Sequence, residues 1–258
     1  MITIAVANQK GGVGKTTTAI NIATAMAATG WKTLLIDLDP QGNASTGMGI
    51  ASELRGKSSY DLVVDSAPLA ECVQATSIPG LDIVPATEDL SGAEIELVTV
   101  DDRTGRLKRA LAGHTSHEIA FIDCPPSLGL LTLNALGAAD TLLVPLQCEF
   151  FALEGLSQLL QTVERVQQRF NADLGIVGVV LTMFDRRNRL TDQVADDVRD
   201  CLGPLVFESV IPRNVRLSEA PSHGLPALVY DHNCPGSRAY IALARELIGR
   251  LPQTRKAA

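Results

Sequence analysis

The chain has 258 residues, of which 46% are hydrophobic and 20% are charged. This length and apolar content suffice for one large α/β domain with a sizeable core, or for two small ones. The 22 basic and 29 acidic residues give a net charge of −7, which argues against a generic nucleic-acid coat protein. No apolar run is long enough to span a bilayer. The first strand is expected from residue 2, with no leader sequence before it, so we expect a cytoplasmic protein.

The cysteines are spread through the chain without a CxxC pair or a His-rich spacing. This distribution indicates neither a zinc site nor a disulfide framework, so we expect reduced thiols. The five cysteines are Cys72, Cys124, Cys148, Cys201 and Cys234.

A glycine-rich loop follows the first predicted strand. Residues 2–7 form an apolar, β-branched run, residues 8–18 read NQKGGVGKTTT, and residues 19–28 are small and compatible with a helix. A glycine-rich loop between a strand and the start of a helix is the context that a phosphate-binding loop requires. The sequence therefore predicts a nucleotide-binding site here.

The residue types of this loop suit phosphate and magnesium. The glycines at 11, 12 and 14 have no Cβ atoms, so consecutive backbone N–H groups can converge on phosphate oxygens. Lys15 is expected to reach the β- and γ-phosphates, and the hydroxyl of Thr16 to ligate Mg²⁺. The helix that begins near Lys15 adds the positive end of its dipole.

Two carboxylates follow the second predicted strand. Residues 32–36 are expected to form a buried parallel strand, which runs into Asp37-Leu38-Asp39-Pro40-Gln41. Ligands of open α/β sheets bind at this end of the strands. Either aspartate alone could simply form a turn before the proline, but the neighbouring phosphate loop favours a functional interpretation.

The next stretch is less informative. Residues 60–63 are expected to form a short helix, residues 77–80 a turn and residues 81–85 a strand. Residues 91–112 are expected to be mostly helical, with a charged face that is solvated. The sequence assigns no function to residues 45–115.

A third acidic strand end lies at Asp123. Residues 118–123 form an apolar run that ends in this carboxylate, as a Walker B strand does, and Asp123 would then hold Mg²⁺ through a water or bind Thr16. The loop at residues 124–129 contains two successive prolines and a glycine, a defined shape that could report occupancy of the γ-phosphate site.

The rest of the chain continues the alternation of strands and helices. Strands are expected at residues 141–146 and 174–183, and helices at 151–170 and 239–251. This alternation predicts a mostly parallel, twisted sheet with helices on both faces. No linker or repeat divides the chain, so we expect a single domain over residues 1–258, with about 251–258 as a flexible tail.

Two arginine clusters stand out against the acidic composition. The first lies in a predicted loop and the second in the run IPRNVRLSEAPSHG at residues 211–224. Solvated arginines, or ion pairs with Asp192, Asp196 and Glu219, are the ordinary interpretation. The arginines are Arg186, Arg187 and Arg189 in the first cluster and Arg213 and Arg216 in the second.

These motifs together resemble one family. The pattern KGGxGKT, with Lys10 as its first lysine, resembles the deviant Walker A motif of the ParA/MinD superfamily of P-loop NTPases. Together with DLDPQGN at residues 37–43 and the run at 211–224, it is similar to the ParA/Soj partition ATPases. The similarity extends from residue 2 to about residue 250.

The resemblance implies a slow, Mg²⁺-dependent ATPase. In that family, Lys10 would cross a dimer interface to the nucleotide of the partner subunit, and Asp39 would orient the attacking water. It thus implies catalytic roles for Lys10, Asp39 and Lys15, and magnesium contacts, partly through water, for Thr16, Asp39 and Asp123. The nucleotide contacts that it implies are Lys10, Gly11, Gly12, Val13, Gly14, Lys15, Thr16 and Thr17, with Pro212, Arg213 and Asn214 near the adenine.

The resemblance also implies partners. An ATP-bound homodimer of this family binds double-stranded DNA without sequence preference, through arginines that match Arg187 and Arg216. Arg186, Arg189 and Arg213 could add to this patch, although Arg213 could equally face the nucleotide. A ParB-type centromere-binding protein would stimulate hydrolysis, and the protein would associate with the nucleoid.

Three alternatives stay open. A MinD-like ATPase would cycle on membranes through a basic amphipathic C-terminal helix, but residues 239–251 have few basic residues and aromatics, so we expect that helix to pack on the domain. An orphan relative would position a protein cargo instead of DNA. A nucleotide switch without turnover would dimerise with ATP but release no phosphate. An operator-reading helix-turn-helix is not expected, because nothing precedes the first strand.

Overall fold

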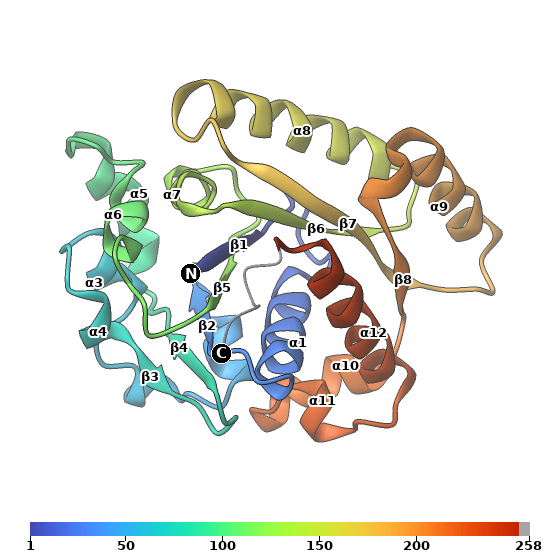
Figure 1. The fold of residues 1–258 in the computed structure, drawn as a ribbon, viewed down its shortest axis with the longest axis horizontal. Helices are drawn as coiled ribbons and strands as arrows, with labels where there is room; N and C mark the ends of the chain where they lie inside the picture. Colours follow the sequence, from blue (N-terminus) through green and yellow to red (C-terminus); the bar gives the residue numbers. More distant parts are fainter. Residues whose placement is uncertain (253–258) are drawn as a thin grey trace.

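An eight-stranded sheet forms the centre of the computed structural model, which describes residues 1–252 (Figure 1). Its strand order is β3-β4-β2-β5-β1-β6-β7-β8, and every neighbouring pair is parallel except β3 and β4. The predicted class, a mostly parallel sheet between helices, is confirmed. The strands are β1 Ile2–Val6, β2 Thr33–Asp37, β3 Gln74–Ala75, β4 Leu81–Val84, β5 Ile119–Asp123, β6 Thr141–Gln147, β7 Gly175–Phe184 and β8 Val206–Pro212.

Helices connect these strands and cover both faces of the sheet. The α-helices are α1 Lys15–Ala28, α2 Asn43–Gly47, α3 Ser59–Val63, α4 Leu69–Cys72, α5 Leu90–Glu96, α6 Arg106–Leu111, α7 Leu130–Ala138, α8 Ala152–Arg169, α9 Arg189–Leu202, α10 Val215–Glu219, α11 Ala227–Tyr230 and α12 Pro235–Arg250. Short 3-10 helices are η1 Ser52–Leu54, η2 Leu97–Thr99, η3 Gly203–Leu205 and η4 Ala220–His223.

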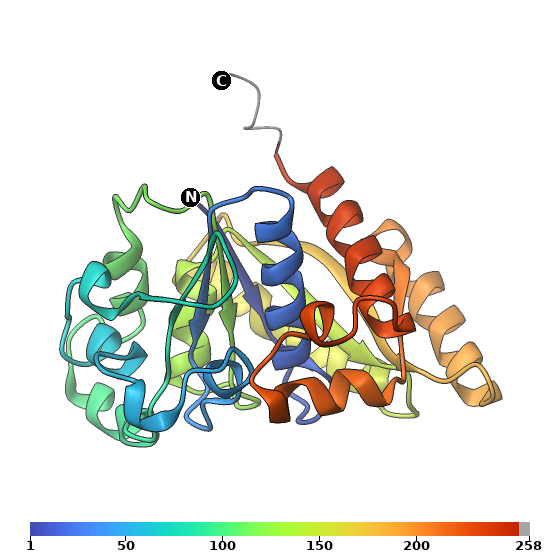
Figure 2. The same ribbon diagram turned by 90° about the horizontal axis from the view of Figure 1, so that it is seen from below.

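The alternation of side chains along each strand divides the core into two layers. On β2, Leu34 and Ile36 belong to the layer under α7 and α8, whereas Leu35 belongs to the layer under α1 and α12. Figure 2 shows α1 and α12 together on the second face. Because both faces are covered, the central strands are apolar throughout, as is typical of parallel sheets.

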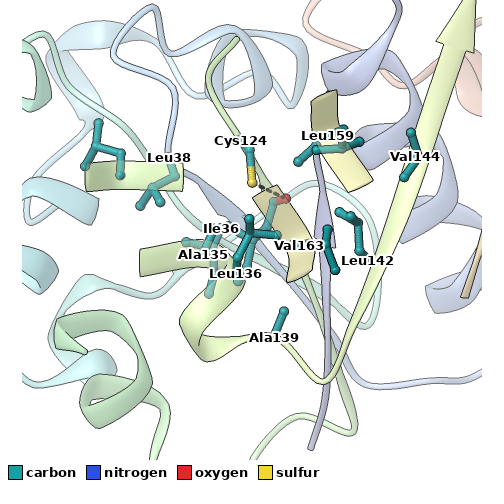
Figure 3. Packing of buried hydrophobic residues seen from close by; sticks show 14 of the residues in the cluster. Ile36, Leu38, Cys124, Ala135, Leu136, Ala139, Leu142, Val144, Leu159 and Val163 are labelled. Carbon is teal, nitrogen blue, oxygen red and sulfur yellow. Dashed lines mark hydrogen bonds between the residues drawn. The ribbon is translucent and has the colours of Figure 1, made fainter. Parts of the chain in front are cut away.

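Helix α8 shows how the apolar pattern of the sequence fixes the packing. Its buried residues recur at intervals of three and four, at Leu156, Leu159, Val163 and Val166, which places them on one face of the helix. Figure 3 shows Leu159 and Val163 among the side chains of this layer, close to Leu142 of β6. The predicted apolar stripe is therefore part of the core.

Residues 91–112 are mostly helical, as predicted, but the break within them was not predicted. The segment folds as α5 and η2, then a turn, and then α6. The β-branched run at residues 98–100 lowers helix propensity, and Asp102 adopts a left-handed conformation with φ +52°. The antiparallel strand β3, which lies at an edge of the sheet, was not predicted either.

The C-terminal helix packs on the sheet, as expected. Helix α12 begins at Pro235, four residues before the predicted start, and buries Tyr240, Leu243 and Leu247 in the core. Leu251, the first residue of the expected tail, is also buried. Residues 253–258, which make up most of that tail, lie outside the described residues. Within residues 1–252, no helix combines the length and apolarity needed to cross a bilayer.

The core of α8 gives a test of the fold. Leu159→Ala should lower the free energy of unfolding by about 2–5 kcal/mol, because it removes a fully buried side chain and leaves a cavity. Ser157→Ala on the exposed side of the same helix is the matched control and should change it little. Chemical denaturation of both variants measures the difference, and equal costs would contradict this packing.

Candidate active site at the carboxyl edge of the sheet

The glycine-rich loop forms an open cradle between β1 and α1. Gly12 and Gly14 adopt left-handed conformations, with φ +75° and +87°, that other residues rarely adopt. A Cβ at Gly11 or Gly12 would meet nothing within 4 Å, so the backbone here faces open space. Val13 is buried, and its carbonyl accepts a 2.9 Å hydrogen bond from Thr182 of β7. The loop can therefore present its N–H groups to an anion at the start of α1.

Lys15 lies inside this cradle. Its Nζ donates a 2.9 Å hydrogen bond to the carbonyl of Lys10, and the residue is only 6% exposed. Burial lowers the pKa of Lys15, and the nearby Asp123 and Asp39 carboxylates oppose that shift. Thr16 follows on the first turn of α1, half-buried. The ammonium group thus sits between the loop and the acidic strand ends.

Three central strands end side by side at this site. In the sheet register Asp123 of β5 pairs with Val6 of β1 on one side and with Asp37 of β2 on the other. Both carboxylate oxygens of Asp123 are buried, and neither has a hydrogen-bond partner among residues 1–252. Burial raises the pKa of Asp123 well above its usual value, and the charge of Asp37 adds to the rise. The hydroxyl of Thr16 lies near Asp123 and partly offsets the increase in its pKa, but the two side chains do not form a hydrogen bond.

An orphaned buried carboxylate is costly unless a cation or donor completes it. The donor set at the site consists of hard oxygens from Thr16, Asp39 and Asp123, which suits Mg²⁺. Among the described residues no three His, Cys, Asp or Glu side chains are grouped closely enough to hold a metal by themselves. This arrangement fits Mg²⁺ in particular, because that ion usually keeps several waters and binds substrate phosphates.

Asp37 and Asp39 have different surroundings. The Asp37 carboxylate is fully buried and accepts hydrogen bonds from the N–H and hydroxyl of Ser45 at 2.7 and 2.6 Å, and from the N–H of Asp39 at 3.2 Å. Burial raises the pKa of Asp37 to about 6. Asp39 accepts one 3.0 Å bond, from Gln41 N–H to Oδ1, and none at Oδ2 within the described chain. Asp37 is therefore fixed by hydrogen bonds within the protein, whereas Oδ2 of Asp39 has no partner in the described chain.

A second wall comes from the end of β8. Pro212, Arg213 and Asn214 line a cavity of about 180 Å³ together with Gly14 and Thr17 of the loop and first helix. The fold thus brings residues 212–214 beside the phosphate cradle. Six further lining residues were not among the predicted site residues: Thr182, Met183, Ile211, Leu217, Ser218 and Tyr240. Met183 has φ +51°, a strained conformation for a non-glycine residue that no sequence signal announces.

Lys10 is held within its own chain. Its ammonium forms an ion pair with Glu149, just after β6, while the side chain remains 44% exposed. Glu149 was not among the predicted site residues, because its partner lies 139 positions away in the sequence. The lysine expected to act across a dimer is therefore partly accessible and paired with a carboxylate.

The structure brings the two arginine clusters together. The N–H of Arg213 donates a 3.1 Å bond to the carbonyl of Phe184, which joins the start of each cluster. Arg187 binds Asp185 through two side-chain hydrogen bonds of 2.9 and 2.8 Å. Within residues 1–252, the exposed side chains of Arg186, Arg189 and Arg213 form no hydrogen bond or ion pair.

The second cluster contains a similar local pair. Arg216 binds Glu219 at 2.9 Å and approaches Asp231 at 3.6 Å, with its guanidinium 5.9 Å from the ring centre of Tyr230. The ordinary interpretation of the arginines as ion-paired is thus correct for Arg187 and Arg216 in this state, although the acidic partner of Arg187 is Asp185.

A larger hollow, of about 820 Å³, lies at the opposite, amino edge of the sheet. Trp31, His117 and Arg250 are among the residues that line it. The glycine loop and the acidic strand ends take no part in it, so we assign the chemistry to the carboxyl edge.

Comparison with known proteins identifies relatives over nearly the whole chain. A protein-family model described as "AAA domain" matches residues 1–176. The chromosome partitioning protein ParA of Caulobacter vibrioides (strain NA1000 / CB15N) is 57% identical over 250 residues, covering 96% of this chain and 94% of the relative. The sporulation initiation inhibitor protein Soj of Bacillus subtilis (strain 168) is 52% identical over 245 residues, covering 95% and 97%.

A solved structure is similar over nearly the whole chain. It is described as the cobyrinic acid a,c-diamide synthase of Mycobacterium smegmatis with bound ATP analog and magnesium. It has a TM-score of 0.85 and 37% sequence identity, covering 99% of this chain and 98% of that one. The higher identities to ParA and Soj, over almost full lengths, decide the family. The chain belongs to the ParA/Soj family of chromosome-partitioning ATPases.

Proposed function

We propose that this protein is an ATP- and Mg²⁺-dependent ATPase that dimerises around ATP, binds duplex DNA without sequence preference in that state, and segregates chromosomes or plasmids. The observation that carries the proposal is the pairing of an open glycine cradle around Lys15 with the orphaned carboxylate of Asp123. Its relatives carry the name of partitioning ATPases, and a similar structure holds an ATP analog and magnesium.

The residues divide the chemistry among them. The loop N–H groups and Lys15 bind the phosphates, while Thr16, Asp39 and Asp123 hold Mg²⁺, partly through water. When bound, Mg²⁺ neutralises charge on the phosphate oxygens. The free oxygen of Asp39 orients the attacking water. The cavity beside Pro212–Asn214 receives the adenine.

Dimerisation places Lys10 in the nucleotide site of the partner subunit. There its ammonium offsets charge that develops on the phosphates. Because Lys10 is paired with Glu149 in the single chain, this ion pair has to open or rearrange as the dimer closes. Both side chains are partly exposed, so solvent screening keeps the loss small.

DNA binding follows from the doubled arginine surface. Non-specific binding is mainly neutralisation of phosphates with release of counterions, and one chain of net charge −7 offers few cations for it. A two-fold dimer doubles the surface of Arg187 and Arg216 and aligns it along one duplex. The exposed pairs with Asp185 and Glu219 are weak and exchange for DNA phosphates. Affinity for DNA thereby depends on ATP.

The proposed cycle needs a partner and a location. A ParB-type centromere-binding protein stimulates a slow basal hydrolysis, and the reset protein leaves the nucleoid for the cytoplasm. Helix α12 buries its apolar residues in the core, so this face is not available for insertion into a membrane, which supports the DNA track in the proposal.

Asp39→Ala tests the catalytic assignment. We expect normal ATP binding, a persistent dimer, and phosphate release lower by about 100-fold, the contribution of a positioned general base or water-orienting group. Phosphate release and light scattering with ATP measure these quantities. Lys15→Ala is the reference for lost nucleotide binding. Hydrolysis at the wild-type rate in Asp39→Ala would show that Asp39 is not the positioning group.

Arg187→Glu tests the DNA surface. Wild-type protein should bind a random-sequence duplex with ATP but not with ADP or without nucleotide, and the variant should bind at least tenfold more weakly. In the dimer two phosphate contacts are lost, so the slope of log affinity against log salt should fall by about 1.8. Arg165→Glu, an exposed arginine on α8 outside both clusters, is the charge-matched control. Equal losses in the two variants would contradict a specific surface.

A further inference from the structure

Helix α5 carries a buried carboxylate atom that the proposed chemistry does not use. Oε1 of Glu94 is buried and has no hydrogen-bond partner among the described residues. Buried polar atoms normally have a partner, so each exception calls for an explanation. The orphaned oxygens of Asp123 are explained by Mg²⁺, whereas Glu94 does not belong to the metal site.

The Glu94 carboxylate lies against Gly129, which ends the loop of residues 124–129. A Cβ added at Gly129 would lie 1.7 Å from Oε1 of Glu94, so the end of this flexible side chain would have to move away. The φ of Gly129 is −78°, which other residues adopt readily. The Glu94 carboxylate can therefore reach the start of α7 because position 129 has no side chain.

Gly129 is also the N-cap of α7, and it has no side chain with which to cap that helix. In the described chain, the N–H groups of Leu130, Leu131 and Thr132 form no hydrogen bond. Free N–H groups and the helix dipole attract a carboxylate at this end. The unpaired Oε1 of Glu94 thus lies next to unpaired N–H groups at the start of α7.

A chain of contacts through α5 connects Asp37, at the end of β2, with the loop that follows Asp123, at the end of β5. The hydroxyl of Ser45 donates to Asp37 at 2.6 Å and accepts from the N–H of Ala86 at 2.9 Å. Ala86 lies four residues before α5. On its other side α5 touches Gly129, whose loop begins directly after Asp123.

We propose that Glu94 is a positioning residue that caps α7 when nucleotide occupies the site, and so fixes the loop of residues 124–129. The inference rests on the proposed ATP cycle and adds a regulatory contact to it. A small movement of the loop turns the N–H groups of Leu130 and Leu131 toward the carboxylate. The resulting charge-assisted hydrogen bonds hold the loop in its nucleotide-bound position.

Amide hydrogen exchange at residues 130–132 tests this role, with and without Mg²⁺-ATP. ATP should slow exchange there about tenfold in the wild type, the size expected for a helix cap. Glu94→Ala should abolish the slowing, and Glu94→Gln, which keeps a neutral acceptor, should retain part of it. Glu88→Ala, an exposed residue just before α5, should behave as wild type. The same Glu94 variants should lower kcat while KM and ATP affinity stay within twofold.

A second experiment tests the contact without nucleotide. Gly129→Ala should push the flexible Glu94 carboxylate away from the start of α7, so it should speed hydrogen exchange at residues 130–132 when Glu94 is present and change it little further in Glu94→Ala. Wild-type protein that fails to bind ATP would contradict the proposed ATPase itself. Protein that binds ATP but shows equal slowing at residues 130–132 in wild type and Glu94→Ala would overturn only the role of Glu94.

Discussion

The incomplete charge balance at the carboxyl edge of the sheet is the constraint on which the site depends. Asp123 is buried with no hydrogen-bond partner among residues 1–252, and Lys15 is buried beside it. Burial disfavours the charged form of both groups, which is why their pKa values move in opposite directions. A cation bound beside Asp123 and a polyphosphate bound beside Lys15 relieve this cost, because each buried charge then has a charge of opposite sign next to it.

The fold creates this constraint by bringing distant segments into register. β5 lies between β1 and β2, so the glycine loop, Asp37 and Asp123 meet although they are far apart in the sequence. Ser45 and the N–H of Asp39 together satisfy both carboxylate oxygens of Asp37, which is therefore held in place. Asp39 lies two residues further on and keeps a free oxygen. The difference between the two aspartates is a difference in hydrogen-bond partners, and it underlies the proposed roles of Asp37 in structure and of Asp39 in catalysis.

Local patterns made much of this predictable from the sequence. The glycine loop, the central strands and the apolar stripe of α8 are each encoded within a few turns or residues, and the structure contains all of them. The place of the site at the carboxyl edge followed from the rule that ligands of open α/β sheets bind there, whereas the strand order that makes Asp37 and Asp123 neighbours was not predicted.

Features that depend on distant or compensating contacts could not be predicted. The pairing of Lys10 with Glu149 joins residues 139 positions apart. The left-handed Met183 reflects strain imposed by its surroundings. In the mostly helical segment of residues 91–112, a β-branched run and one left-handed aspartate accompany a break between η2 and α6 that the sequence pattern did not predict. Such features come from tertiary packing, which single-sequence periodicity does not record.

The most direct test of the central claim is the affinity for ATP with and without Mg²⁺, in wild-type protein and in Asp123→Asn. If the orphaned carboxylate is built for a magnesium–nucleotide complex, Mg²⁺ should raise the affinity of the wild type by at least tenfold. The variant keeps the shape of the side chain but not its charge, so it should lose most of this gain and still bind free ATP through Lys15 and the loop. Affinity that is independent of Mg²⁺ in the wild type would contradict the account.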